Sequence, residues 1–157
     1  MNDALDLLLQ TRKNFIELVD GLSIEELNAV PTGFSNNIIW NFAHTLAAQQ
    51  LLCYKLSGLP MHLEAGFVDA YKKGSKPQGK VSEVEIKKYK EEALFLINRI
   101  SSDLEAGIFK TYTPYTTSYG TTISNIEQAI KFVNIHEGLH LGYAMALRKA
   151  VKTIPDR

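Results

Sequence analysis

Residues 132–142, FVNIHEGLHLG, place two histidines, His136 and His140, one helical turn apart. The residues around them at steps of three and four are mostly apolar, which predicts the buried face of one long helix. That face consists of Ala129, Val133, His136, His140, Tyr143, Leu147 and Val151. Imidazoles on a buried face need partners, and side chains at positions i and i+4 lie over each other. The pair therefore predicts a metal ion, which would use both rings at once; the alternative is two ordinary helical histidines, one of them satisfied by a polar neighbour.

The rest of the chain also has helical periodicity. The best-defined helix start is at Ser82, because Glu85 completes a capping box there. Val81 and Ile86 occupy the positions of a hydrophobic staple at the same helix start. The segment 23–26, Ser-Ile-Glu-Glu, has the same capping form and predicts a short extra turn. The expected helices span about 3–20, from Ser35 or Asn36 to Ser57, 82–104, and from 121–124 to about 152.

Two long connections, 58–80 and 105–120, separate these helices, and neither contains a convincing strand hairpin. The first is expected to carry a turn of its own or part of a site rim, and the second to be a crossover or a site wall. We therefore predict an all-α fold, a four-helix bundle with long crossover connections, as a single domain over residues 1–157.

Composition excludes several classes of function. Lys plus Arg (17) equals Asp plus Glu (17), and such a neutral balance argues against nucleic acid or a polybasic membrane anchor. The sequence has no apolar run near the roughly 18 residues of a membrane span. Cys53 is the single cysteine, so no internal disulfide forms, and we expect a cytoplasmic protein. Cys53 itself is interpreted as a small packed hydrophobe.

A third ligand is expected from the helix that ends at Ser57. His44 lies on its inner face and points at the His136–His140 pair if the two helices are neighbours. Three imidazoles leave one coordination position open, which is typical of catalytic metal sites. Neutral imidazole suits zinc, nickel, iron or cobalt, so the ligand type does not decide the metal. The fourth histidine, His62, lies in a loop and is expected to be solvated.

Residues 136–140 also match the H-E-x-x-H pattern of zinc proteases, with Glu137 as the base. The seventeen residues after His140 contain no Glu or His to serve as a third ligand, which argues against the protease interpretation. Glu137 remains a candidate proton acceptor at the border of the metal face, or else a solvated or dimer-facing carboxylate. Gly138 and Gly142 indicate either that another group approaches this strip or that the helix surface tolerates them.

Residues 38–44, IIWNFAH, together with 136–142, HEGLHLG, resemble the DinB-like superfamily of metal-dependent enzymes. That group includes YfiT-type proteins and the mycothiol- and bacillithiol-dependent enzymes, and the resemblance covers nearly the whole chain. It implies a bundle with crossover connections, often dimeric, and zinc or nickel bound by histidines matching His44, His136 and His140. Family members with assigned activities are thiol-dependent transferases and isomerases and metal-dependent hydrolases; many have none assigned.

The leading hypothesis is a metal-dependent enzyme that activates water or a thiol, as a thiol-dependent transferase or a hydrolase of a small molecule. The ion would be zinc or nickel, with iron, cobalt and manganese as alternatives. Expected partners are a small-molecule substrate, including a low-molecular-weight thiol, and a second copy of the chain. One alternative is a metal-stabilised dimeric stress or binding protein without turnover, and the zinc protease is the third. Candidate side chains around the site are Trp40, Asn41, Glu137 and Tyr143.

Overall fold

The structure, a computed structural model, describes residues 2–152. Its long helices are α1 (Asn2–Asp20), α3 (Ile38–Gln49), α5 (Glu83–Glu105) and α6 (Ile126–Lys152). Its shorter elements are α2 (Ile24–Asn28), the π-helical turn η1 (Gln50–Tyr54), the 3₁₀ turn η2 (Lys55–Ser57), α4 (Ala65–Tyr71), β1 (Tyr115–Thr116) and β2 (Thr122–Ile123). The expected all-α class is confirmed.

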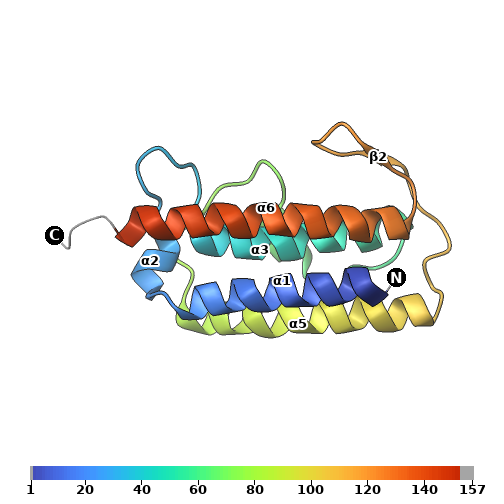
Figure 1. The fold of residues 1–157 in the computed structure, drawn as a ribbon, viewed down its shortest axis with the longest axis horizontal. Coiled ribbons are helices and arrows are strands. Elements are labelled where there is room, and N and C mark those ends of the chain that lie inside the picture. Colours follow the sequence, from blue (N-terminus) through green and yellow to red (C-terminus); the bar gives the residue numbers. More distant parts are fainter. Residues whose placement is uncertain (1, 153–157) are drawn as a thin grey trace.

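The long helices pack side by side as a bundle, with α3 against α6, α6 against α1, α1 against α5 and α5 against α3. Figure 1 shows α1 and α6 running in one direction and α3 and α5 in the other. The connection from α3 to α5 therefore returns along the bundle and is a crossover, whereas the connection from α5 to α6, the one expected to be a crossover or a site wall, is not a crossover. The connection from α5 to α6 joins ends that lie at the same end of the bundle.

The sequence signals at the helix starts are largely confirmed. Ser82 and Glu85 form the capping box of α5, and Ser23 and Glu26 form another at α2. The start of α3 differs by one or two residues from the prediction, because its cap is Asn37, whose side chain accepts from the backbone N–H of Trp40.

Both long connections carry structure of their own. The first contains α4, which lies against α3. The second runs on to the start of α6 at Ile126, past the expected helix start at 121–124. It contains an antiparallel hairpin that pairs Tyr115 with Ile123 and Thr116 with Thr122, so the expectation of no hairpin is wrong. Each strand has two residues, which is too short for an alternating pattern to stand out in a sequence.

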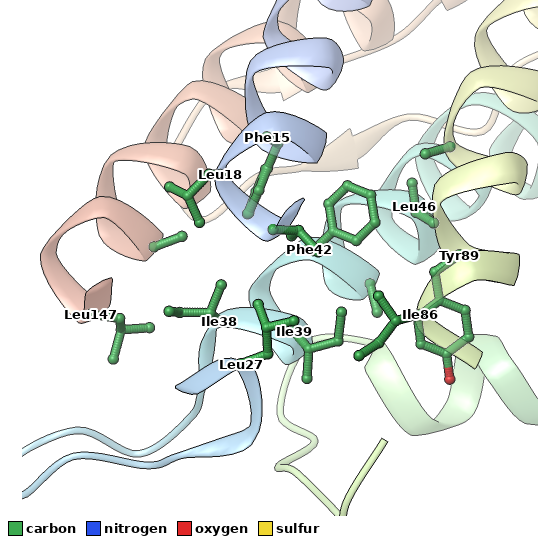
Figure 2. Close-up of a cluster of buried hydrophobic side chains, with 14 of the residues drawn as sticks. Phe15, Leu18, Leu27, Ile38, Ile39, Phe42, Leu46, Ile86, Tyr89 and Leu147 are labelled. Carbon is green, nitrogen blue, oxygen red and sulfur yellow. The ribbon is translucent and has the colours of Figure 1, made fainter. Parts of the chain in front are cut away.

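The core forms where the apolar faces of the bundle meet. Figure 2 shows one part of it, in which Phe15 packs edge-on against Phe42, with ring centroids 5.1 Å apart. All twelve residues of α3 are buried, which explains why this helix can hold a histidine deep in the protein. Within residues 2–152, no helix is long and apolar enough to cross a membrane.

Candidate metal centre

Three histidines converge between α3 and α6. His44 comes from α3, and His136 and His140 come from successive turns of α6, as the sequence predicts. One ring nitrogen of each lies within 4.8 Å of the other two. The three rings are close neighbours, with centroids 4.5 to 5.0 Å apart. The packing of α3 on α6 thus brings together side chains separated by more than ninety residues.

The backbone of α4 fixes the orientation of His44. Its Nδ1 lies 2.6 Å from the carbonyl oxygen of Tyr71, the last residue of α4. Because a carbonyl only accepts, Nδ1 carries the proton, and Nε2 presents its lone pair to the other two histidines. The indole of Trp40 stacks nearly parallel on one face of the His44 ring, with ring centroids 4.8 Å apart.

An asparagine fixes His140 in the same way. The side-chain amide N–H groups of Asn41 donate to the carbonyl of Asn37 and to Oδ1 of Asn36. Its Oδ1 is therefore the atom that lies 2.8 Å from His140 Nδ1, and it accepts the proton of that nitrogen. His140 Nε2 is left unprotonated, like Nε2 of His44.

Burial keeps the three rings neutral. It lowers the pKa of His44, and it lowers the pKa of His136 to about 4, with the nearby His44 contributing. The pKa of His140 falls to about 3, chiefly through burial and then through His136 and His44. At neutral pH all three offer the uncharged form that binds metals.

The spacing fits a metal ion of ordinary coordination geometry. Two nitrogens that each bind a tetrahedral zinc at about 2.0–2.1 Å are roughly 3.3–3.4 Å apart. His44 Nε2 and His136 Nε2 are separated by 3.3 Å. Together with the fixed tautomers, this distance makes the three histidines a suitable set of ligands for a divalent cation.

Glu137 is placed differently from the expectation. It is fully buried, and its carboxylate forms a two-pronged pair with Arg12 of α1, at 2.5 Å from Nε and 2.7 Å from Nη2. Both carboxylate oxygens are therefore engaged away from solvent, and Glu137 is neither a solvated nor a dimer-facing carboxylate. The arrangement gives no support to Glu137 as a base, or to the H-E-x-x-H protease interpretation that requires one.

Three other residues singled out from the sequence have varied environments. Tyr143 packs its ring against Phe34, at 5.6 Å, and does not line the cavity at the histidines. His62 is an exposed residue, as its loop position predicts, although its side chain also approaches a carboxylate, with Nε2 3.5 Å from Asp103 Oδ2. Cys53 is buried as expected, and burial raises the pKa of its thiol to about 12.

Sequence reasoning missed Arg12 and the carbonyl of Tyr71. Arg12 falls on the same stripe of α1 as Leu8 and Phe15, and it is completely buried. A charged residue on an apolar stripe was the available signal, by the reasoning that identified the histidines. The carbonyl of Tyr71 belongs to the backbone, and no side-chain pattern reports it.

A cavity of about 500 Å³ opens beside the three histidines. Trp40 lines it from α3, Phe132 and Leu139 line it from α6, and Tyr119 lines it from the hairpin segment. This volume lies within the range of small-molecule sites. The site thus combines a metal-ligand set with room for a small substrate.

The comparisons with known proteins agree with this architecture. A model of the DinB superfamily matches residues 7–144, which include all three histidines. The search of curated proteins gives no match. Because the family model spans most of the chain, the protein belongs to the DinB superfamily.

Proposed function

We propose that this protein is a metal-dependent enzyme that acts on a small molecule through the ion held by His44, His136 and His140. The observation that carries the proposal is the convergence of three ring nitrogens within 4.8 Å beside a cavity of about 500 Å³. Zinc or nickel is the proposed metal, with iron, cobalt and manganese as alternatives. When bound, such an ion polarises a substrate and lowers the pKa of a coordinated water or thiol.

Other residues of the chain orient the histidines and line the cavity. Tyr71, through its carbonyl, and Asn41, through its amide, hold His44 and His140 in the tautomer that leaves Nε2 free. Trp40 closes one face of His44 and lines the cavity. We assign Trp40 and Asn41 as positioning residues; Tyr143, which lies outside the cavity, is not carried further.

Thiol transfer takes precedence over hydrolysis in this proposal. Glu137 is engaged by Arg12, so the acidic residue next to His136 is not free to take a proton from water. A thiol, with an ordinary pKa of about 8.5, needs a much smaller shift than water, at about 15.7, to ionise at neutral pH beside the ion. The proposed partner is therefore a low-molecular-weight thiol together with an electrophilic small molecule, with hydrolysis as the second candidate.

We also propose that the protein is a homodimer in the cytoplasm. An exposed apolar strip on α6, Ile135 and Leu139, runs beside Gly138 and Gly142. A Cβ atom built on either glycine would meet nothing within 4 Å in the described chain, so the expected close approach does not occur within one copy. A second copy facing the strip would supply it. The alternative without turnover, a metal-stabilised dimeric binding protein, would use the same ligands and the same surface.

Metal analysis tests the central claim. Protein purified without an affinity tag is stripped with a chelator and titrated with zinc against a chromogenic competitor. The wild type is expected to bind one equivalent of zinc. His140→Ala is expected to bind zinc at least about tenfold more weakly, since losing even a residue that only orients a ligand lowers metal affinity by about that factor. His62→Ala is the matched control, because His62 lies outside the cluster. Equal affinity in wild type and His140→Ala would refute the assignment.

Activity separates the enzyme from the binding protein. The zinc-loaded and nickel-loaded proteins are mixed with cysteine or glutathione and a chromogenic electrophile, and then with simple esters and amides. Thiol consumption that requires metal and is lost in His140→Ala supports the transferase. Metal-dependent ester or amide cleavage alone would support the hydrolase, and tight metal binding without any turnover would favour the binding protein.

A further inference from the structure

The cavity beside the histidines has a distribution of charge that neither the metal site nor the family requires. Of the lining residues in the described chain, Lys55 and Lys73 carry the charge, and no Asp or Glu is among them. A cavity with two positive groups thus lies in a chain whose formal net charge is zero.

In the part of the chain that the structure describes, neither lysine forms an ion pair with a carboxylate. Within residues 2–152, Lys73 has no ion-pair partner within 4.0 Å, and its neighbour Lys72 already pairs with Asp69 at 2.7 Å. Asp69 also attracts Lys55, but only weakly, and it does not line the cavity. Both ammonium groups are therefore available to an anion that enters from solvent.

The rest of the lining is apolar. Leu51, Leu52 and Leu56 line the cavity from the end of α3 onward, and Phe132 and Leu139 face them from α6. Trp40, His44, Ala48, Leu52 and Leu56 recur every four residues, which places this wall along one helical stripe.

The hairpin supplies the outer wall. Tyr115 and Tyr119 both line the cavity and are both partly exposed, at 38% and 51%. Tyr119 is held by an edge-on contact with Phe132, with ring centroids 5.4 Å apart. Figure 1 shows the hairpin standing beside the first turns of α6. Aromatic walls of this kind accept flat or aliphatic molecules.

We infer that the cavity selects small organic anions, molecules with an apolar or aromatic body and one anionic group that Lys55 and Lys73 attract. This inference rests on the proposed function, because it names the substrate class for the same site. The apolar body lies between the leucines and the hairpin tyrosines, and the anionic group lies toward the lysines. Selection of this kind requires no metal, since the lysines belong to the chain.

The test compares two probes of nearly the same shape, naphthalene-1-acetate and its neutral amide, naphthalene-1-acetamide. Both are titrated into isotope-labelled protein, and amide chemical shifts give the affinity and the location. The metal-free protein is expected to bind the acid about fivefold more tightly, because one exposed charge pair contributes up to about that factor and the cavity holds two lysines. The preference should shrink in 0.5 M salt, and the shifts should map to the cavity.

Three variants assign the preference. Lys55→Met with Lys73→Met is expected to equalise the two probes, and each single change to remove part of the difference. Lys76→Met is the matched control, because Lys76 lies on the same loop as Lys73 but does not line the cavity. Equal binding of the two probes to the metal-free wild type, or a preference that survives the double change, would overturn the inference.

Repeating the titration with zinc-loaded protein keeps the two proposals apart. A preference for the acid that appears only with zinc, and that ignores the lysines, would mean that the anion binds the metal. The present inference would then fail while the metal site stands. If zinc does not bind at all, the proposed function fails, and the charge preference is still measured in the metal-free protein.

Discussion

Asn41 determines which nitrogen of His140 is available to a ligand. It is completely buried, and both its donor and its acceptor groups have partners. A hydrophobic residue of similar size would fill the space but leave the Nδ1–H of His140 unpaired and the ring free to change tautomer. The single amide therefore connects the capping region of α3 to the chemistry of α6.

We expect Asn41→Leu to weaken zinc binding by about ten- to hundredfold, the usual effect of losing a partner of a metal-bound histidine. The measurement is competitive zinc titration, with helical content followed by circular dichroism. Asn41→Asp is the control, because it keeps an oxygen acceptor for Nδ1–H and should bind zinc more tightly than Asn41→Leu. Equal affinities in the two variants would show that the hydrogen bond does not position the ring.

Arg12 and Glu137 form a buried pair with further partners on two other helices. Arg12 also donates to the carbonyl of Ala93 in α5 and to Oε1 of Gln49 in α3. The guanidinium thus contacts α3, α5 and α6 from α1. Removing one charge leaves the other buried without a counter-charge. The resulting loss of folding stability is larger than the net stabilisation that the pair contributes.

Glu137→Gln is expected to lower the free energy of unfolding by about 3–5 kcal/mol, because the Arg12 guanidinium then lacks its counter-charge in the core. Urea denaturation measures the change. The double variant Arg12→Met with Glu137→Met should be more stable than Glu137→Gln by at least ~1 kcal/mol, since it removes both charges together. Unchanged stability in Glu137→Gln, combined with lost turnover, would restore a catalytic role for Glu137.

The long helix α6 has two faces with different environments. One face carries His136 and His140 toward α3, and another carries exposed Ile135 beside Gly138 and Gly142. Leu139 lies at the border of the two faces, since it is exposed and also lines the cavity. Glycine inside a helix costs about 1 kcal/mol relative to alanine, and nothing in residues 2–152 of one copy occupies the space that these glycines leave.

If α6 faces a second copy, Gly138→Ala with Gly142→Ala should raise the dissociation constant of the dimer at least about tenfold, because two Cβ atoms separate surfaces packed to normal density. Sedimentation equilibrium measures it. Gly66→Ala in α4 is the control, since a Cβ there also meets nothing within 4 Å. A stable dimer that is unaffected by the change at 138 and 142 would place the interface elsewhere.

Across the whole chain, the sequence predicts the features that show as periodic side chains, namely the long helices and the three histidines. It does not predict contacts made by backbone groups or by residues on distant helices. The sequence predicts His44 as a ligand because it lies on the inner face of its helix and the pair at 136 and 140 needs a third ligand. Glu137 was misplaced because its partner, Arg12, is 125 residues away. The hairpin at 115–123 escaped notice because two-residue strands carry too little periodicity. Tyr71 holds His44 through a carbonyl, which every residue possesses.

The metal ligands join α3 to α6, so metal binding should stabilise the whole bundle. An ion that binds only the folded chain adds about 2.7 kcal/mol at one hundred times its dissociation constant, or roughly 5–10 °C in Tm for a domain of this size. We expect zinc to produce this shift in metal-free protein followed by calorimetry, and magnesium to produce none, because it prefers oxygen ligands. His44→Ala should abolish most of the shift, since it removes the ligand from α3, whereas His62→Ala should retain it. Equal Tm values for the wild type with and without zinc would show that the three histidines pack together without binding the ion.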